Sequence, residues 1–358
     1  MKKLLIALLL ASFVSNLQSQ DKNSSSSYPN GKIFGSVFGD YFYKAGGDST
    51  VSPLDFTAYK KDYNTFEFRR IFLGYEHNFS EDFYSKVTLA YEGPSDVASN
   101  GKRNVILKDA FLNWKNIFSN TNLTFGLFPT IAYSYHSEKI WGNRFVEKMI
   151  LDQRGLTASR DFGLMINGAF DKSGDFGYYA MVATGSGQAI EKNKYKKFSG
   201  MLFGNFAGKK FTADLYADYE PYENDKSKST WNAFVAYQVP ELTIGLESFI
   251  SIQKNFNVNV PTNPGNIEPF GISFFVRGNL SGEKVKFFSR YDYYNPDSRT
   301  AQYDYYNHFV TAGIDYLPLP NIHITPNLWL NAYARKNPAG KGRKTDVVPR
   351  ITFSYDYK

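Results

Sequence analysis

The chain has 358 residues, contains no cysteine and carries a formal net charge of +7 at pH 7. The lack of cysteine excludes disulfide bridges, thiolate metal sites and a lipid anchor on an N-terminal cysteine. The basic excess is spread thinly along the chain, which argues against a nucleic-acid partner. Aromatic residues make up 18% of the chain, with 27 Tyr and 32 Phe, and tyrosine in such numbers suits strands and membrane–water boundaries.

The N-terminus has the pattern of an export signal. It begins with MKK, continues with the apolar run 4–14 and then turns polar. An apolar run too short to span a bilayer predicts a secretory signal peptide over residues 1–19; the alternative is a membrane-anchor helix. Loss of the two lysines of this leader lowers the formal charge from +7 to +5. We expect the Ser-rich residues 20–31 to be disordered and residues 32–358 to form the folded domain.

Alternating segments follow one another from there to the C-terminus. In FTADLYADYE, residues 211–220, every second residue is apolar, and Asp214 and Asp218 stand on the opposite face. A period of two predicts a strand with one apolar and one acidic face. In a soluble sandwich the apolar face would line a core, whereas in a membrane barrel it would face lipid and the acidic face a wet lumen. The same alternation recurs at residues 83–92, 230–238, 242–251, 270–277, 285–293 and 350–357.

The connections between these segments alternate in length. Short connections lie at residues 78–82, 172–175, 206–210, 239–241, 280–283 and 317–321. Long ones lie at residues 45–63, 93–103, 129–156, 186–194, 221–228, 254–267, 295–302 and 337–343. Outer-membrane barrels have this asymmetry of tight periplasmic turns and long outer loops, and a soluble sandwich gives no reason for it. We therefore predict an all-β fold, a transmembrane antiparallel up-and-down β-barrel of about sixteen strands, within about 14–18, in the cell outer membrane.

Two details of this barrel are also predicted. The alternation breaks beside Arg69 and Arg70, which indicates a β-bulge or a change of strand phase. Tyrosines should form girdles near the lipid boundaries, where a ring can bury its body and keep its hydroxyl wet. The tyrosines expected there are Tyr237, Tyr291, Tyr293, Tyr316, Tyr355 and Tyr357.

The interior of such a barrel is too wide for wall side chains to fill, so an aqueous channel is its expected content. The longest internal connection is the 129–156 loop, and a loop this long in a compact fold is usually functional or disordered. Because its apolar residues need a surface to bury against, we expect it to fold inward and narrow the pore. An outer cap and a contact with a neighbouring subunit are the alternatives. The residues expected at the constriction are Trp141, Arg144, Glu147, Lys148 and Arg154.

Five stretches run in the order seen in porins. They are KDAFLNW from Lys108, FGLF from Phe125, FVEKM from Phe145, RDFGLMINGAF from Arg160 and YYAMVATGSG from Tyr178. These stretches resemble the phosphate-selective porin O and P family, best over residues 66–187. The resemblance implies a sixteen-stranded outer-membrane channel, commonly a trimer, whose third loop narrows the pore. The 129–156 loop matches that loop by position, which would make Arg144, Lys148 and Arg154 its basic groups.

The inward charges depart from the pattern of a phosphate-specific pore, in which clustered bases replace the hydration of an anion. The expected inward bases are Lys86, Arg277, Lys286, Arg290 and Arg350. The expected inward acids include Glu92, Asp214, Asp218, Glu247 and Asp292. Such charges can orient small polar solutes without a strong ion preference, or they can be ion pairs that stiffen the wall. We therefore predict a diffusion channel for small hydrophilic solutes or ions, with at most a weak anion preference.

Two other functions were weighed. A hydrolase would need a serine, a histidine and an orienting group, and His136 does lie between Ser134 and Ser137, but no G-x-S-x-G elbow or metal-ligand spacing occurs. A structural or adhesive barrel without an open pore is the remaining alternative. The sequence thus predicts no catalytic residue, metal or cofactor. Its expected partners are outer-membrane lipid, small polar or anionic solutes and two further copies of the chain.

Overall fold

The computed structural model describes residues 28–49, 54–93, 97–257, 265–299, 305–336 and 342–357. The expected signal peptide, residues 1–19, and residues 20–27 of the expected leader lie outside the described residues. The first strand begins at Asn30, two residues before the expected start of the folded domain. Within the described part of the chain, no helix is long and apolar enough to cross a membrane.

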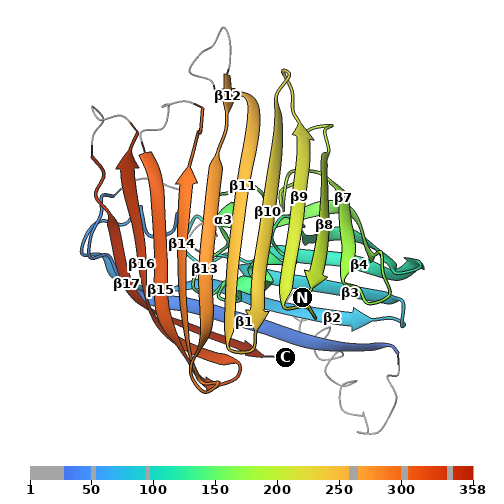
Figure 1. The fold of residues 1–358 in the computed structure, drawn as a ribbon, viewed down its shortest axis with the longest axis horizontal. Helices are drawn as coiled ribbons and strands as arrows, with labels where there is room; N and C mark the ends of the chain where they lie inside the picture. The colour runs from blue at the N-terminus through green and yellow to red at the C-terminus, as the bar shows by residue number, and fades with distance from the viewer. Residues whose placement is uncertain are drawn as a thin grey trace, which may run out of the picture.

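Seventeen strands in the described residues form one antiparallel sheet (Figure 1). They are β1 (Asn30–Tyr43), β2 (Asn64–Asn78), β3 (Phe83–Tyr91), β4 (Ile106–Phe118), β5 (Thr121–Pro129), β6 (Arg160–Ala169), β7 (Phe176–Ala183), β8 (Lys197–Phe206), β9 (Phe211–Pro221), β10 (Ser227–Val239), β11 (Leu242–Asn257), β12 (Gly265–Ile267), β13 (Phe270–Ser281), β14 (Val285–Asn295), β15 (Tyr305–Leu319), β16 (Ile322–Arg335) and β17 (Asp346–Tyr357). Two short helices, α2 (Ser137–Trp141) and α3 (Ile150–Gln153), lie in the 129–156 loop.

The sheet closes on itself because β1 pairs with both β2 and β17. Strand β12 has only three residues and extends the pairing of β11, so sixteen strands go round the barrel. Each strand is antiparallel to its neighbours in the chain, and the predicted up-and-down barrel is confirmed. Long connections gather at one end of the barrel and short turns at the other, which is also the end where β1 begins and β17 finishes.

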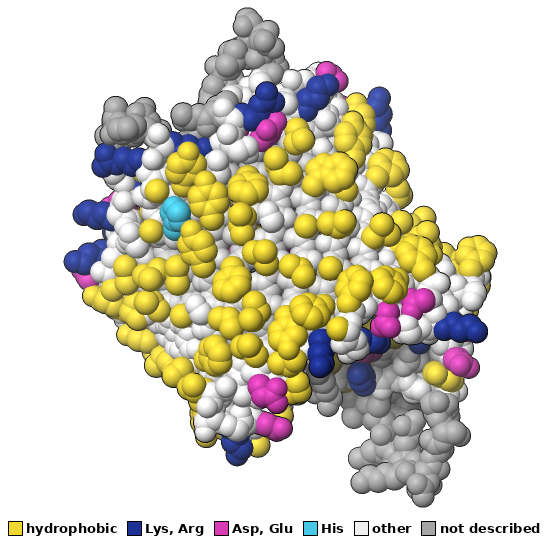
Figure 2. Space-filling model, in the orientation of Figure 1, with side chains coloured by type: hydrophobic (Ala, Val, Ile, Leu, Met, Phe, Trp, Pro, Cys, Tyr) yellow, Lys and Arg dark blue, Asp and Glu magenta, His cyan; other side chains and the backbone are white. Residues whose placement is uncertain are grey.

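The two faces of each strand lie as the alternation predicts. On β9, Leu215 is 65% exposed on the outside, whereas its neighbours Asp214 and Tyr216 are buried inside. On β10, the outward Trp231 and Val235 are likewise exposed. Figure 2 shows the result, an apolar band across the barrel wall with charged side chains gathered towards its two ends. An apolar band outside and a polar interior are the arrangement of a barrel that spans a bilayer.

The tyrosines expected in girdles stand near strand ends. Tyr237, Tyr316, Tyr355 and Tyr357 lie within a few residues of the short turns or of the end of β17. Tyr291 and Tyr293 lie near the opposite end of β14. All six are at least partly exposed on the outer face, where a ring can meet the boundary between lipid and water.

The break in alternation at Arg69 and Arg70 is a β-bulge. Phe38 of β1 pairs with Arg70, and the next residue, Gly39, pairs with Phe68, so Arg69 is the extra residue of β2. A bulge re-aims the side chains beside it. Both arginines are therefore buried inside the barrel, although neighbours on a regular strand would face opposite ways.

Replacing Leu215 by arginine tests the lipid-facing side. Because this side chain lies near the middle of β9, the charge should lower the free energy of unfolding by about 2–4 kcal/mol. The measurement is a denaturant titration of protein folded into lipid vesicles, with Leu215→Ala as the matched control for lost side-chain volume. Equal unfolding midpoints for the arginine and alanine variants would show that this face does not meet lipid.

Candidate pore constriction

The 129–156 loop lies inside the barrel, and its apolar side chains pack largely against the inward faces of β8 to β14. Most of its apolar side chains are buried, and six are fully so: Ile131, Trp141, Val146, Met149, Ile150 and Leu151. They form one cluster with inward residues of β8 to β14, namely Met201, Tyr216, Phe234, Phe249, Phe275 and Phe288. Inward apolar residues on these strands would be costly in a lumen full of water, and the loop covers them. Figure 1 shows α3 behind the front strands.

Four arginines of the wall hold the backbone of this loop. Arg69 and Arg350 both donate to the carbonyl oxygen of Val146, at 2.6 and 2.7 Å. Arg277 donates to the carbonyl oxygen of Ile140 at 2.9 Å, and Arg290 to that of Lys148 at 2.5 Å. These arginines come from β2, β17, β13 and β14, so the loop is fastened on several sides. Arg277, Arg290 and Arg350, which the sequence analysis expects in the lumen, thus bind the loop.

Side chains of the loop complete the attachment. Glu147 accepts a hydrogen bond from the indole of Trp329 at 2.9 Å and lies 3.7 Å from Arg69. Trp141 donates its indole N–H to the carbonyl oxygen of Glu147 at 2.9 Å. Arg154 places its guanidinium 4.6 Å from the ring centroid of Tyr294. Of the residues expected at the constriction, Trp141, Glu147 and Arg154 therefore lie buried against the wall.

The expected inward acids also form hydrogen bonds or ion pairs with neighbouring side chains. Glu247 accepts from Ser137 at 3.2 Å and from Asn232 at 3.1 Å. The other pairs are Asp214 with His136, Asp218 with Lys197, Asp292 with Arg290 and Glu92 with Lys108. Two expected inward bases lie apart from this set. Lys86 faces Glu76 at 3.7 Å, and Lys286 lines a cavity of about 270 Å³ near the short turns.

Residues 54–63 of the 45–63 loop also turn into the barrel, a feature that the sequence predictions do not include. Phe56 is buried with its ring centroid 4.8 Å from that of Phe42 and 5.5 Å from that of Trp329. Asp55 accepts a hydrogen bond from Arg69 at 2.7 Å. The fully buried Lys44, just before the loop, pairs with Asp346 and donates to the carbonyl oxygen of Phe56 at 2.9 Å.

A cavity of about 490 Å³ lies between the two inward loops and strands β1 to β4. The acids that line it are Asp40, Asp55, Glu67, Glu92 and Asp152. The bases that line it are Arg69, Arg70, Arg144 and Lys148. Three aromatic rings also line the cavity, those of Phe42, Phe56 and Tyr59. The structure thus brings three of the predicted site residues together here: Arg144 and Lys148 from the loop and Glu92 from the wall.

Solved structures share this architecture, although no protein-family model and no curated protein matches the sequence. The outer membrane channel DcaP of Acinetobacter baumannii superposes with a TM-score of 0.69 at 12% identity, over 94% of this chain and 100% of that one. The anion-selective porin from Comamonas acidovorans does so with a TM-score of 0.61 at 11% identity, over 92% and 100%. The chain has the fold of an outer-membrane porin. A trimer form of OmpT, an outer membrane protein of Vibrio cholerae, superposes with a TM-score of 0.58 at 10% identity, over 92% and 100%.

In this porin fold, two loop carboxylates of the cavity stay ionised. Partial burial by itself would raise the pKa of Asp55, but Lys148, Arg69 and Arg70 outweigh it and hold the pKa well below its usual range. Burial would also raise the pKa of Asp152, and the cations of Arg144 and Lys148 lower it. Because opposite charges nearby favour the charged form, the cavity keeps both negative charges at neutral pH.

The histidine considered for catalysis ties the 129–156 loop to the wall. His136 Nδ1 lies 3.0 Å from a carboxylate oxygen of Asp214, and its ring centroid lies 4.9 Å from that of Phe203. Ser137 donates to Glu247, so it does not face the histidine as a nucleophile. Among the described residues, no group of three His, Cys, Asp or Glu side chains is placed to hold a metal ion.

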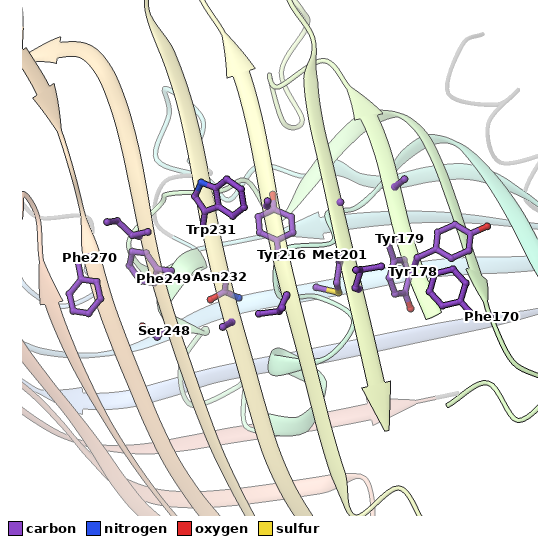
Figure 3. Close-up of a pocket in the computed structure, with 17 residues that line it drawn as sticks. Phe170, Tyr178, Tyr179, Met201, Tyr216, Trp231, Asn232, Ser248, Phe249 and Phe270 are labelled. Atoms are coloured by element: carbon purple, nitrogen blue, oxygen red, sulfur yellow. The ribbon is translucent and has the colours of Figure 1, made fainter. Parts of the chain in front are cut away.

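A hollow of about 950 Å³ lies on the outside of the barrel and not in its lumen. It crosses β7 to β13, and Trp231 and Phe270 are among the lining residues labelled in Figure 3. Exposed apolar side chains such as Leu202 and Leu215 line it together with small residues such as Gly200 and Ala217. The hollow lies within the apolar band, so lipid chains are its expected content. It offers no path for a hydrophilic solute.

Proposed function

We propose that the chain is an outer-membrane diffusion channel that passes small hydrophilic solutes and ions. The observation that carries the proposal is the charge-lined cavity of about 490 Å³ that the inward loops leave inside a closed barrel. Charged walls replace part of the hydration of a polar solute, and the apolar band outside keeps the barrel in a bilayer. The fold shared with porins supports the same function.

The 129–156 loop acts as the constriction in this proposal. Its Arg144, Lys148 and Asp152 face the cavity, whereas its apolar side chains pack against inward residues of β8 to β14. The hydrogen bonds of Glu147 with the indole of Trp329, and of the Trp141 indole with the Glu147 carbonyl oxygen, hold the loop in place inside the barrel. Solutes would pass between the loop and strands β1 to β4.

The ion preference follows from the charges of the cavity. Five acids and four bases line it, and several are already paired, for example Arg144 with Asp152 at 2.9 Å. Such a balance supports weak selectivity. The likeness to an anion-selective porin supports a slight preference for anions. The stretches that resemble the phosphate-selective porin O and P family support a place beside that family, but three of the expected bases bind loop carbonyls, which disfavours phosphate specificity.

A homotrimer is part of the proposal. The sequence resemblance implies one, and the trimer form of OmpT shares the fold. Crosslinking of protein in native membranes, followed by electrophoresis, should give a species of three chains. A crosslinked species no larger than one chain would contradict the trimer and leave the channel proposal intact.

Reconstitution in a planar bilayer tests the channel itself. We expect discrete current steps in KCl and a reversal potential close to zero under a salt gradient, because acids and bases nearly balance. A strong anion preference would favour the phosphate-selective branch. Absence of current from protein shown to be folded and inserted would contradict the diffusion channel and favour a structural barrel.

A further inference from the structure

Two opposite charges from different loops, Asp55 and Lys148, line the cavity. Asp55 of the 45–63 loop keeps 34% of its side chain exposed and has an ion pair with Arg69 at 2.7 Å. Lys148 of the 129–156 loop lies close enough for its charge to act on Asp55. Nevertheless, the two side chains form no direct ion pair in the described structure. A gap therefore separates a carboxylate from an ammonium group, with each supplied by a different loop.

Lys148 is a cation held at a fixed place. Its backbone N–H donates to the side chain of Glu147 at 2.9 Å, and its carbonyl oxygen accepts from Arg290 at 2.5 Å. Its Nζ makes no hydrogen bond or ion pair with any described residue. The backbone is thus anchored on both sides while the ammonium group stays available to a solute.

Arg70 is a second base of the cavity, with its donors turned to the protein. The bulge in β2 turns it inward, where Nη1 donates to the carbonyl oxygens of Arg69 and Glu92, both at 2.7 Å. Its Nε lies 3.5 Å from a carboxylate oxygen of Glu92 but is buried without a hydrogen-bond partner in the described structure. The guanidinium is therefore held by the protein itself and contributes fixed positive charge to the lining of the cavity.

Aromatic rings form another part of the lining. The ring of Phe42 packs against those of Phe56 and Tyr59, with centroids 4.8 and 5.2 Å apart. All three rings line the cavity, which offers apolar surface to the uncharged middle of a solute. Its volume lies within the range of about 300–1,000 Å³ that is common for small-molecule sites.

We propose that this cavity is a transit site for zwitterionic solutes of about dipeptide size, with the ammonium group towards Asp55 and the carboxylate towards Lys148. The inference rests on the proposed channel function. A monoanion would gain from Lys148 but meet the negative charge of Asp55, and a monocation would meet the reverse. Only a solute with both charges, separated by a few bonds, is attracted at both ends.

Permeation into liposomes that contain the full chain tests the site. Three probes of similar size and different charge are compared at pH 7: glycylglycine, N-acetylglycine and glycylglycinamide. Glycylglycine should enter about two- to fivefold faster than the other two, the factor that one partly screened charge pair gives. The KCl conductance of the same protein in a planar bilayer reports separately whether the channel is open.

Variants that neutralise one charged side chain at a time test which end of the solute each side chain attracts. Asp55→Asn should slow glycylglycine and glycylglycinamide relative to N-acetylglycine. Lys148→Gln should slow glycylglycine and N-acetylglycine relative to glycylglycinamide. The matched controls are Asp225→Asn and Lys254→Gln, which neutralise an exposed pair with a separation of 2.9 Å outside the cavity and should leave all three rates unchanged.

The outcomes separate this inference from the channel proposal. If the channel conducts but the three probes enter at equal rates, the zwitterion site alone is overturned. The same conclusion follows if the cavity variants and the control variants give the same ratios of probe rates. An inserted parent protein that conducts no current would overturn the channel and the site together.

Discussion

Methionine in place of Arg69 is expected to release both inward loops and raise the single-channel conductance. Arg69 donates to the carbonyl oxygen of Val146 at 2.6 Å and to Asp55 at 2.7 Å, so it joins the 129–156 loop to the 45–63 loop. It also lies 3.6 Å from Asp40 and 3.7 Å from Glu147, two carboxylates that are almost fully buried. Removing one partner of a buried ion pair costs about 3–5 kcal/mol, because the other charge is left uncompensated.

The substitution should destabilise the two inward loops more than the barrel, because the backbone hydrogen bonds between the strands are unchanged. Planar-bilayer recordings should show larger and noisier current steps, and the unfolding midpoint in lipid vesicles should fall. Arg103→Met is the matched control, because Arg103 is 49% exposed and pairs with Glu67 at 3.0 Å. A surface pair of this kind is worth about 1 kcal/mol or less. If both variants conducted and unfolded alike, Arg69 would not be the link between the loops.

The barrel could be predicted from the sequence because its rules are local. Side chains alternate along any strand, so the order Asp214, Leu215 already assigns one residue to the lumen and the other to lipid. The alternation of short and long connections then separates a membrane barrel from a soluble sandwich. Even the bulge at Arg69 was visible, since a residue inserted in one strand must break the period of two.

The roles of the inward bases could not be predicted in the same way. Strand alternation gives the direction of Arg277, Arg290 and Arg350, but not what each side chain contacts. Their partners include carbonyl oxygens of the 129–156 loop, and every sequence supplies such oxygens. The position of that loop depends on apolar packing over many strands, which no local pattern encodes. Arg154 illustrates the same limit, because it packs on Tyr294 and does not line the cavity of about 490 Å³.

The inward turn of the 45–63 loop did leave a signal in the sequence. Leu54, Phe56 and Tyr59 are large apolar or aromatic residues in this connection. The same argument, that such residues need a surface to bury against, singled out the 129–156 loop. Applied to every long connection, it would also have found Asp55, which lies between Leu54 and Phe56 and is carried into the cavity with them.

Alanine in place of Trp141 should detach the 129–156 loop while the barrel remains folded. The indole is fully buried, its ring centroid lies 5.1 Å from that of Phe275, and its N–H donates to the carbonyl oxygen of Glu147. Truncation of a buried tryptophan costs about 3–5 kcal/mol. Helix α2 has five residues, too few to be stable without packing, so it should lose its structure with the side chain.

Limited proteolysis measures this detachment directly. Arg144 and Lys148 are cleavage sites for trypsin that the parent protein keeps partly buried against the wall. Trp141→Ala should be cut there and should conduct with unstable current steps. Trp231→Ala is the matched control, because the same residue type faces lipid from β10 and is 57% exposed, away from the loop. It should resist trypsin and conduct like the parent, since its loss leaves every attachment of the loop in place. Uncut loops and steady currents in both variants would mean that the wall arginines hold the loop without the tryptophan.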